Sequence, residues 1–273
     1  MAYTTVDNPE LYFQTKLYTG NGGTQSITLD GSENMQPDWV WFKNRTDAGQ
    51  NHLLYDSVRG ATKTLKSSTT GAEVTDSGGL TSFDSDGFSV GDKGSLNNSS
   101  ASIVAWNWKA GGSASSNSNG SITSTVSANQ TAGFSIVSYT ATSGMSSIGH
   151  GLGVTPSVIF LKTRDQSASW FVGNASLGWD KILFLNLTNA SSTDDRVFSP
   201  SAGSDPTSSV FFSDQAGVAN AGTMIAYCFA EKKGYSKFGS YTGNGSLDGS
   251  FVYTGFKPAW VMIKRTDSST GAN

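Results

Sequence analysis

An internal repeat constrains the fold of this chain more than any other feature of its sequence. The same landmarks occur three times, and each copy opens with a tyrosine and a short polar turn, at Tyr18, Tyr139 and Tyr241. A proline then opens an apolar run that ends with a lysine, over residues 37–43, 156–162 and 258–264. Repetition of this kind predicts one structural unit for each copy.

The first two copies also end alike. Residues 103–108 and 224–229 both have the pattern of a strand with large side chains two positions apart, on one face of the pleat. Units one and two are therefore predicted over residues 13–110 and 132–234. Residues 235–273 hold only the start of a third unit, too short to bury its own apolar strands. We expect the chain to continue beyond this point and complete the unit, with completion by a neighbouring chain as the alternative.

Composition favours an all-β fold. Charged residues make up only 14% of the chain, aromatic residues make up 11%, and there are 32 glycines. Short strands separated by Gly, Asn, Asp and Ser fit this composition, and no longer stretch shows helical periodicity. The sequence predicts tandem antiparallel β-sandwich units of the jelly-roll or concanavalin-like type.

The repeated apolar strand is predicted to be covered on both faces. In unit one, Trp39 and Trp41 share one face of the pleat. Val40 and Phe42 share the other face, so neither side of this strand can be left in water without exposing large apolar groups. The lysine that ends each copy, such as Lys43, is expected where the strand leaves the core.

Two segments lie outside the complete units. Residues 1–12 precede the repeat and are a candidate anchor segment. Residues 111–131 are predicted to be a linker rich in Ser, Gly and Asn, flexible over 111–120, that leads into a short strand. Units two and three meet at Gly234 with almost no linker, so their coupling is expected to be more rigid than that of units one and two.

Charge and hydropathy argue against two classes of partner. The net charge is −3 and no cluster of Lys and Arg is found, which is unlike a nucleic-acid-binding surface. No apolar stretch reaches the roughly 18 residues of a membrane span, so no membrane insertion is expected. Residues 1–10 also lack the basic and apolar regions of a secretory signal.

The sequence offers few groups for catalysis or metal binding. Cys228, the single cysteine, lies in an apolar run and is expected to be a buried, inert thiol. His52 lies in an apolar strand and His150 in a glycine-rich turn, and both are expected to be structural. Two histidines in different units make a poor zinc site, so neither a metal nor another cofactor is predicted.

The acidic residues also lack the pattern of an active site. Asp84 and Asp86 resemble part of a calcium loop without its later glutamate, so a turn is expected there. Gly20, Gly22 and Gly23 are expected to be turn glycines. The remaining carboxylates of unit one mostly lack acidic counterparts in unit two: Asp56, Glu73 and Asp92. No catalytic residue is predicted, and the chain is expected not to be an enzyme.

Exposed aromatic side chains are the remaining route to a ligand, because they can stack on sugar rings. Trp170 and Trp179 flank loop segments and are the best candidates for exposure, although core packing is the favoured role of both. The ligand-binding residues stay unknown from the sequence.

Several strings resemble a module that occurs in tandem in tail-fibre and other virion proteins of marine, cyanophage-like bacteriophages. They cover the chain from about Tyr12 onward: residues 121–156, together with YTGNG, PDWVWFKNRTD, LLYDSVRG, SFDSDGFSVG and VAWNWKAGG. The resemblance implies concanavalin-like or laminin-G-like sandwiches in a virion, and it implies no site residues. Unit two departs from the module where LLYDSVRG and SFDSDGF would stand.

The expected function is that of a non-enzymatic virion protein, a tail fibre or a receptor-binding part that attaches the particle to its host. The alternatives are a capsid-surface knob or a secreted bacterial carbohydrate-binding adhesin, and an enzyme that degrades host polysaccharide is a third possibility. Expected partners are other copies of the chain in a homotrimer, other virion proteins through residues 1–12, and a glycan or protein of the host surface. Trimerisation is expected by analogy with phage fibres.

Overall fold

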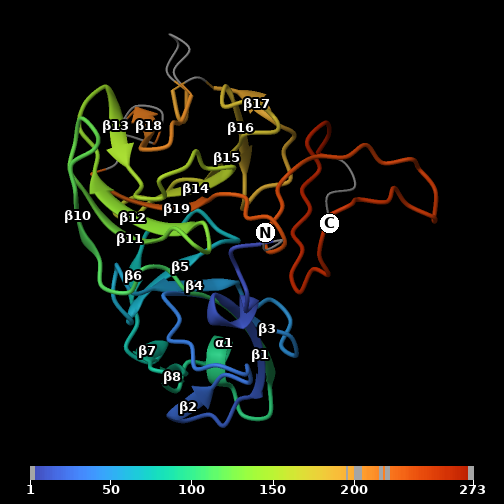
Figure 1. Ribbon diagram of the computed structural model, residues 1–273. Coiled ribbons are helices and arrows are strands. Elements are labelled where there is room, and N and C mark those ends of the chain that lie inside the picture. Colours follow the sequence, from blue (N-terminus) through green and yellow to red (C-terminus); the bar gives the residue numbers. More distant parts are fainter. Residues whose placement is uncertain (1–3, 195, 200–204, 215–217, 219–221, 270–273) are drawn as a thin grey trace.

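The computed structural model describes residues 4–194, 196–199, 205–214, 218 and 222–269. Within these ranges the fold is all-β, built from antiparallel sheets, which confirms the predicted class (Figure 1). The named helices are two short turns, η1 (Pro9–Leu11) and α1 (Gly94–Asn97).

Unit one is a sandwich of a large and a small sheet. In spatial order the large sheet contains β1 (Phe13–Thr19), β9 (Ser102–Trp108), β3 (Trp39–Asn44), β4 (Leu53–Asp56), β5 (Lys63–Lys66) and β6 (Val74–Thr75). The small sheet contains β2 (Gln25–Thr28), β8 (Gly87–Val90) and β7 (Leu80–Asp84). Val40 and Phe42 of β3 point between the sheets and pack with Phe88 in the core of this unit.

Unit two repeats this plan with a longer large sheet. In spatial order that sheet contains β10 (Ser115–Asn117), β11 (Ser124–Asn129), β12 (Phe134–Thr140), β19 (Thr223–Phe229), β14 (Val158–Thr163), β15 (Phe171–Asn174), β16 (Lys181–Phe184) and β17 (Ser192–Thr193). Its small sheet pairs β13 (Met145–Gly149) with β18 (Val210–Asp214). Ile159 and Leu161 of β14 pack in the core of this unit.

The repeat seen in the sequence is therefore also a repeat of topology. In each unit the strand that closes the repeat lies between the two strands that open it. In unit one β9 pairs with both β1 and β3, and in unit two β19 pairs with both β12 and β14. The opening strands of a unit are thus held together only through its closing strand.

The large sheets of the two units pack face to face, and their facing side chains form one apolar cluster, named here the shared core. Its buried members are Trp39, Trp41, Leu54, Leu65, Trp108 and Ala110 of unit one, with Phe134, Ile136, Val158, Phe160, Trp170, Val172, Leu183, Ile225 and Tyr227 of unit two. Figure 1 shows β4 and β5 lying against the large sheet of unit two. The prediction that both faces of the repeated strand are covered is confirmed, and the cover of the outer face is the other unit.

The linker between units one and two is more ordered than predicted. Ser115–Asn117 form β10, which pairs with β11, and the Gly111 amide donates to Ser127 Oγ at 3.0 Å. A Cβ on Gly111 would lie 2.5 Å from the Ala128 carbonyl oxygen, so the linker runs directly against the sheet edge. Small polar residues can form such an exposed edge strand, because it has no core face to fill. The expectation of a flexible linker over 111–120 is wrong for this part.

The lysine that ends the repeated strand also differs from the prediction in unit two. Lys162 is fully buried, whereas Lys43 in unit one is only half-buried. The Lys162 ammonium donates to the carbonyl of Thr163 at 2.9 Å and to that of Thr70, in unit one, at 3.2 Å. Burial lowers the pKa of Lys162 to about 8. This lysine therefore joins the two units instead of marking a solvent boundary.

The described part of the predicted third unit, residues 235–269, is named here the third segment. It contains no named strand, and many of its apolar side chains are exposed, including Leu247, Phe251 and Tyr253. Its chain extends beside the sandwiches as an open loop, drawn in orange and red in Figure 1. Phe238 and Trp260 are exceptions, because both pack against the shared core.

Candidate functional site

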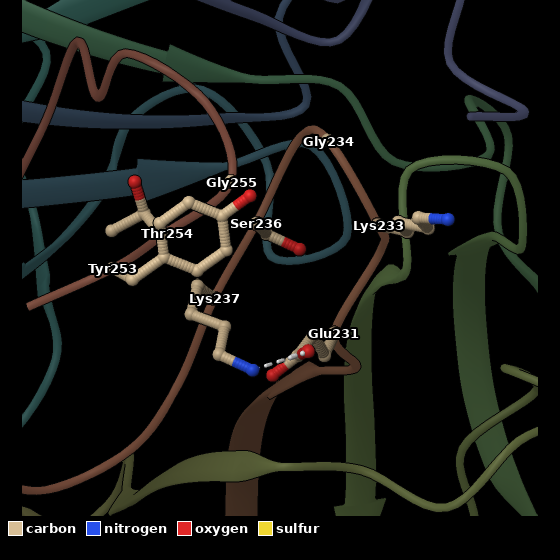
Figure 2. Close-up of a pocket in the computed structure, with 8 residues that line it drawn as sticks. All are labelled: Glu231, Lys233, Gly234, Ser236, Lys237, Tyr253, Thr254 and Gly255. Atoms are coloured by element: carbon tan, nitrogen blue, oxygen red, sulfur yellow. Dashed lines mark hydrogen bonds and ion pairs between the residues drawn. The ribbon is translucent and has the colours of Figure 1, made fainter. Parts of the chain in front are cut away.

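A hollow of about 310 Å³ lies between the end of unit two and the third segment (Figure 2). Its walls come from residues 231–237 and 253–255. Lys237 Nζ lies 3.0 Å from Glu231 Oε1, and the Ser236 hydroxyl accepts a hydrogen bond from the backbone of the same turn. The polar groups of the hollow thus form their hydrogen bonds and ion pair with one another. The hollow holds a surface ion pair, and its polar groups do not converge on a ligand position.

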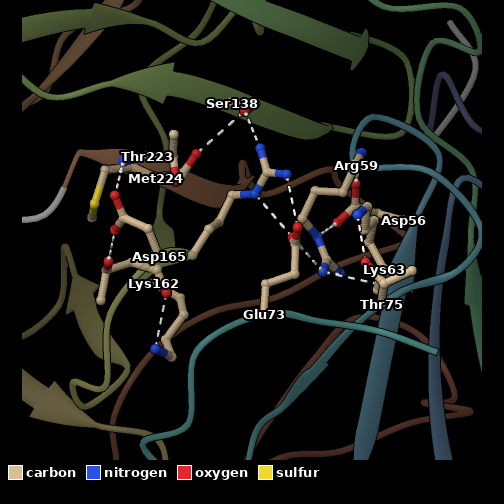
Figure 3. Close-up of polar contacts among 12 residues, drawn as sticks. Asp56, Arg59, Lys63, Glu73, Thr75, Ser138, Lys162, Asp165, Thr223 and Met224 are labelled. Atoms are coloured by element: carbon tan, nitrogen blue, oxygen red, sulfur yellow. Dashed lines mark hydrogen bonds and ion pairs between the residues drawn. The ribbon is translucent and has the colours of Figure 1, made fainter.

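A buried ion pair at the end of β4 begins a second candidate site (Figure 3). Asp56 Oδ1 accepts a hydrogen bond from the Arg59 amide at 2.8 Å, and Asp56 Oδ2 forms an ion pair with Arg59 Nε. The Arg59 guanidinium also donates to the carbonyls of Leu54 and Lys63. Burial alone would lower the pKa of Arg59, but the charges around it, chiefly that of Asp56, raise it above its usual value.

This ion pair continues into unit two. The Tyr227 hydroxyl donates to Asp56 Oδ2 at 2.6 Å and accepts from Arg59 Nη2 at 3.2 Å. Glu73 lies 3.2 Å from Arg59 and receives two hydrogen bonds of 2.9 Å from Arg164, one on each carboxylate oxygen. Charges buried at an interface are tolerated only when they are paired and hydrogen-bonded. This network of ion pairs and hydrogen bonds therefore fixes how the two units face each other.

The same contacts decide what the carboxylates of unit one can do. Burial tends to raise the pKa of Glu73, but Arg164 and Arg59 lower it below its usual value overall. A general acid needs a raised pKa, and Glu73 has the opposite environment. Asp56 and Glu73, both candidates on the sequence, are thus brought together through Arg59, and their geometry is that of structural ion pairs.

Asp84 and Asp86 lie at the hairpin between β7 and β8. Asp84 and Gly87 pair across the β7–β8 hairpin, and Gly87 has a φ of 122° with the Ile27 carbonyl too close for any Cβ. Asp84 accepts hydrogen bonds from Ser82 and Ser89, which confirms the predicted turn. Among the described residues, no group of three or more His, Cys, Asp or Glu side chains could hold a metal ion.

The buried candidates occupy core positions. Cys228 is fully buried in unit two, and burial raises its pKa, which disfavours a reactive thiolate. His150 is also fully buried, and its Nδ1 accepts a hydrogen bond from the Leu152 amide at 3.2 Å. Trp170 and Trp179 are 0% and 5% exposed, so the core role favoured for them is confirmed and neither is available for stacking on a sugar.

Unit one carries a partly exposed aromatic pair, His52 and Trp106, named here the aromatic platform. Their rings are nearly parallel, inclined by 9° with centroids 6.4 Å apart, and both residues are half-buried. Trp41, itself buried, donates from Nε1 to His52 Nδ1 at 2.8 Å and is paired with Trp106 across β3 and β9. The platform is therefore rigid before any ligand binds.

The sequence held a signal for this platform that our predictions did not use. The alternating patterns around Trp41 and Trp106 place both indoles on one face of a sheet. The sequence does not show how much of that sheet face is covered by unit two. It therefore cannot tell that Trp39 on this face is buried while Trp106 on the same face is partly exposed. His52 was assigned a structural role, and its bond to Trp41 fits that role as well as a place in the platform.

Comparisons with known proteins place the chain in a family. Neither the curated proteins nor the solved structures provided a match. Across the described ranges, no helix combines the length and apolar character needed to cross a membrane. Residues 8–272 match the family described as a domain of unknown function, DUF7483, and this match spans both sandwich units and the third segment. The chain therefore belongs to the DUF7483 family.

Proposed function

We propose that this chain is a non-enzymatic structural part of a bacteriophage virion, a tail fibre or receptor-binding component that attaches to the host surface. The observation that carries the proposal is the fusion of two sandwich units through the shared core and the chain of charges from Asp56 to Arg164. Such a block resists bending at the junction, which suits a spacer that holds a binding surface away from a particle. The resemblance of the sequence strings to marine phage modules supplies the virion context.

The aromatic platform is the proposed adhesive surface, and its ligand is a glycan of the host surface. Flat, partly exposed aromatic rings stack on the apolar faces of sugars, and a rigid platform loses little conformational entropy on binding. Burial, with a smaller effect of the Lys43 charge, lowers the pKa of His52 to about 4, so the ring is neutral at physiological pH. A homotrimer would present three platforms and raise a weak contact to useful avidity.

Residues 1–12 remain the proposed attachment point to other virion proteins. The described part of this segment packs on unit one, where the Glu10 carboxylate accepts hydrogen bonds from the amide and hydroxyl of Ser32 at 2.8 and 2.7 Å. Val6 is buried. Residues 4–12 are thus held against unit one, and a capsid-surface knob anchored through the same segment is the alternative location.

Mass spectrometry of purified virions tests the location. The proposal predicts peptides of this chain in the particle at a fixed ratio to the major capsid protein, with immunogold labelling on the tail or at the capsid surface. A chain found only in the medium of uninfected bacteria would support the secreted adhesin and contradict the virion proposal.

Binding to whole host cells tests the platform separately. Trp106→Ala should reduce binding at least tenfold, whereas Tyr241→Ala, which removes an exposed ring outside the platform, should leave binding unchanged. The melting temperature of each variant is measured alongside, and Trp106→Phe should restore part of the binding because it keeps a flat ring. Equal binding by the Trp106 variants and the original chain would refute the platform as the adhesive surface.

A further inference from the structure

The lysine that ends the repeated strand is used differently in the two complete units. An ammonium group offers three N–H donors. In unit two the Lys162 ammonium donates to three carbonyls, those of Thr70, Thr163 and Gln166. In unit one Lys43 is half-buried and donates, among the described residues, to the carbonyl of Gln50 alone. Lys43 therefore keeps N–H donors for a group from outside the chain.

Within the described part of the chain, no carboxylate forms an ion pair with the Lys43 ammonium. Asp47 is the acidic residue nearest to Lys43 in the sequence. Its carboxylate accepts hydrogen bonds from the side chains of Asn44 and Asn98, at 2.9 and 3.0 Å. The positive charge of Lys43 is therefore left to attract an anion from solution.

The Lys43 charge lies beside the aromatic platform. Phe42 and Leu53 pair across β3 and β4, and Lys43 and His52 are the next residues along these two antiparallel strands. The Lys43 charge is close enough to His52 to contribute to the lowered pKa of the imidazole. Lys43 is also two positions after Trp41, so it lies on the sheet face that carries the platform. The cation and the rings thus share one face of the sheet.

The platform itself adds a second hydrogen-bond donor. His52 Nδ1 accepts a hydrogen bond of 2.8 Å from Trp41 Nε1. A neutral imidazole that accepts through Nδ1 carries its proton on Nε2. Among the described residues this Nε2–H has no acceptor. A ligand that covers the platform thus meets two donors, the Lys43 ammonium and the His52 Nε2–H, and the group that complements them is an acceptor.

We infer that the aromatic platform selects an acidic glycan, a sugar chain whose rings carry carboxylates as uronic acids do. The apolar face of a sugar ring stacks on Trp106, and the carboxylate accepts hydrogen bonds from Lys43 and His52. Hydrogen bonds that involve charged groups are shorter and roughly twice as strong as neutral ones. This inference rests on the glycan-binding function proposed above and adds the charge of the ligand to it.

A neutral glycan fits the same surface less well. A sugar that stacks on Trp106 also displaces water from the half-buried Lys43 ammonium. Taking a charge out of water is costly unless an opposite charge and a hydrogen-bond partner replace that water. A carboxylate on the sugar ring supplies both, whereas a hydroxyl supplies only the hydrogen bond. The platform is therefore expected to prefer the charged sugar.

A glycan array of uronic-acid oligosaccharides and their methyl esters tests this preference, because esterification removes the charge and keeps the sugar rings. The full chain should bind the acids about tenfold more tightly than the esters, since an ester offers Lys43 a neutral acceptor only. The difference should shrink as salt is added, because salt screens exposed charges. Equal binding of acids and esters would overturn the inference. So would equally tight binding of polyglutamate, which carries carboxylates without sugar rings.

The variant Lys43→Gln tests which residue recognises the charge. It keeps an N–H donor for the Gln50 carbonyl and removes the positive charge. Binding of the acids should fall about tenfold, to the level of the esters, and binding of the esters should stay unchanged. The control Lys181→Gln removes an exposed lysine charge from unit two and should change neither. An equal loss for acids and esters would mean that Lys43 only supports the platform, and it would overturn the inference.

Trp106→Ala separates this inference from the proposed function. Loss of binding to acids and esters alike in this variant supports the platform as the adhesive surface. Binding that depends on Trp106 without preferring acids would refute the charge selectivity and leave the glycan-binding platform standing. Binding that does not depend on Trp106, or no binding to any glycan of the array, would overturn the platform and the inference together.

Discussion

The indole ring of Trp39 stacks on the phenol ring of Tyr227, with ring centroids 4.5 Å apart and planes inclined by 23°. Trp39 belongs to β3 of unit one and Tyr227 to β19 of unit two, and both are fully buried. The Tyr227 hydroxyl then reaches Asp56 of unit one. Each unit thus supplies the cover that the other needs over its outer face, so neither sandwich is complete without its neighbour.

Trp39→Ala should destabilise the whole chain by about 3–5 kcal/mol, as expected for a large aromatic residue deleted from a packed interior. The ring also contacts Trp108 and Phe134, so the cavity would open onto both units. Denaturant titration measures this loss, with Tyr241→Ala as an exposed control expected to stay within about 0.5 kcal/mol. A loss below about 1 kcal/mol would mean that the shared core is not formed in solution.

Glu73→Gln should cost about 3 kcal/mol, because it leaves the Arg59 and Arg164 guanidinium groups without the charge that joins them. The matched control is Asp30→Asn, which removes the carboxylate of the exposed pair with Lys16 and should cost about 1 kcal/mol or less. Urea titrations of the two variants give the comparison. Equal losses would show that the Glu73 contacts are as weak as a surface pair.

Acid should weaken the fold in part through His52. Its folded pKa, lowered to about 4 mainly by burial, lies below its usual value of 6.5, so the unfolded chain takes up the proton first. The contribution of His52 to stability is therefore full above about pH 6.5 and is lost as the pH falls toward 4. Protonation would also remove the Nδ1 acceptor that Trp41 uses.

The variant His52→Asn tests this dependence, since an amide oxygen can accept the Trp41 hydrogen bond without titrating. The free energy of unfolding of the variant should fall less steeply than that of the original chain between pH 6.5 and 4. Parallel curves for the two proteins would contradict the assignment of this pH dependence to His52.

The third segment, and not the linker, should be the first site of limited proteolysis. Residues 239–257 include exposed positions such as Leu247 and Phe251 and form no strand, whereas Ser115–Asn117 are paired in β10. Proteases prefer exposed segments that can adopt an extended conformation. Mass spectrometry of the earliest fragments should show cleavage within 239–257, and initial cleavage within 111–120 would argue that β10 does not form.

The alternation of apolar residues predicted much of the fold. It placed Val40 and Phe42 on one face of β3 and Trp39 and Trp41 on the other, and both faces are covered. The pattern indicates that a face is buried, but it does not indicate which part of the molecule covers that face. The packing of unit one on unit two therefore could not be predicted from the pattern. The linker was misjudged for a related reason, since an edge strand of Ser and Asn carries no apolar signal.

The polar links between the units could not be predicted either. Glu73 meets Arg164 only because the two large sheets pack at one particular angle, and their separation along the chain gives no hint of contact. The conspicuous Trp170 was a misleading candidate for exposure, because a loop position beside a strand says little about burial when a second unit covers the strand. The aromatic platform was missed because its exposure depends on the extent of that cover.

Differential scanning calorimetry of the chain and its Trp39→Ala variant tests most directly whether units one and two form a single block. The shared core predicts one transition covering both units, with the calorimetric enthalpy equal to the van't Hoff enthalpy. Trp39→Ala should move that whole transition to lower temperature. Two resolved transitions, only one of which moves in the variant, would contradict the account and show that the sandwiches fold independently.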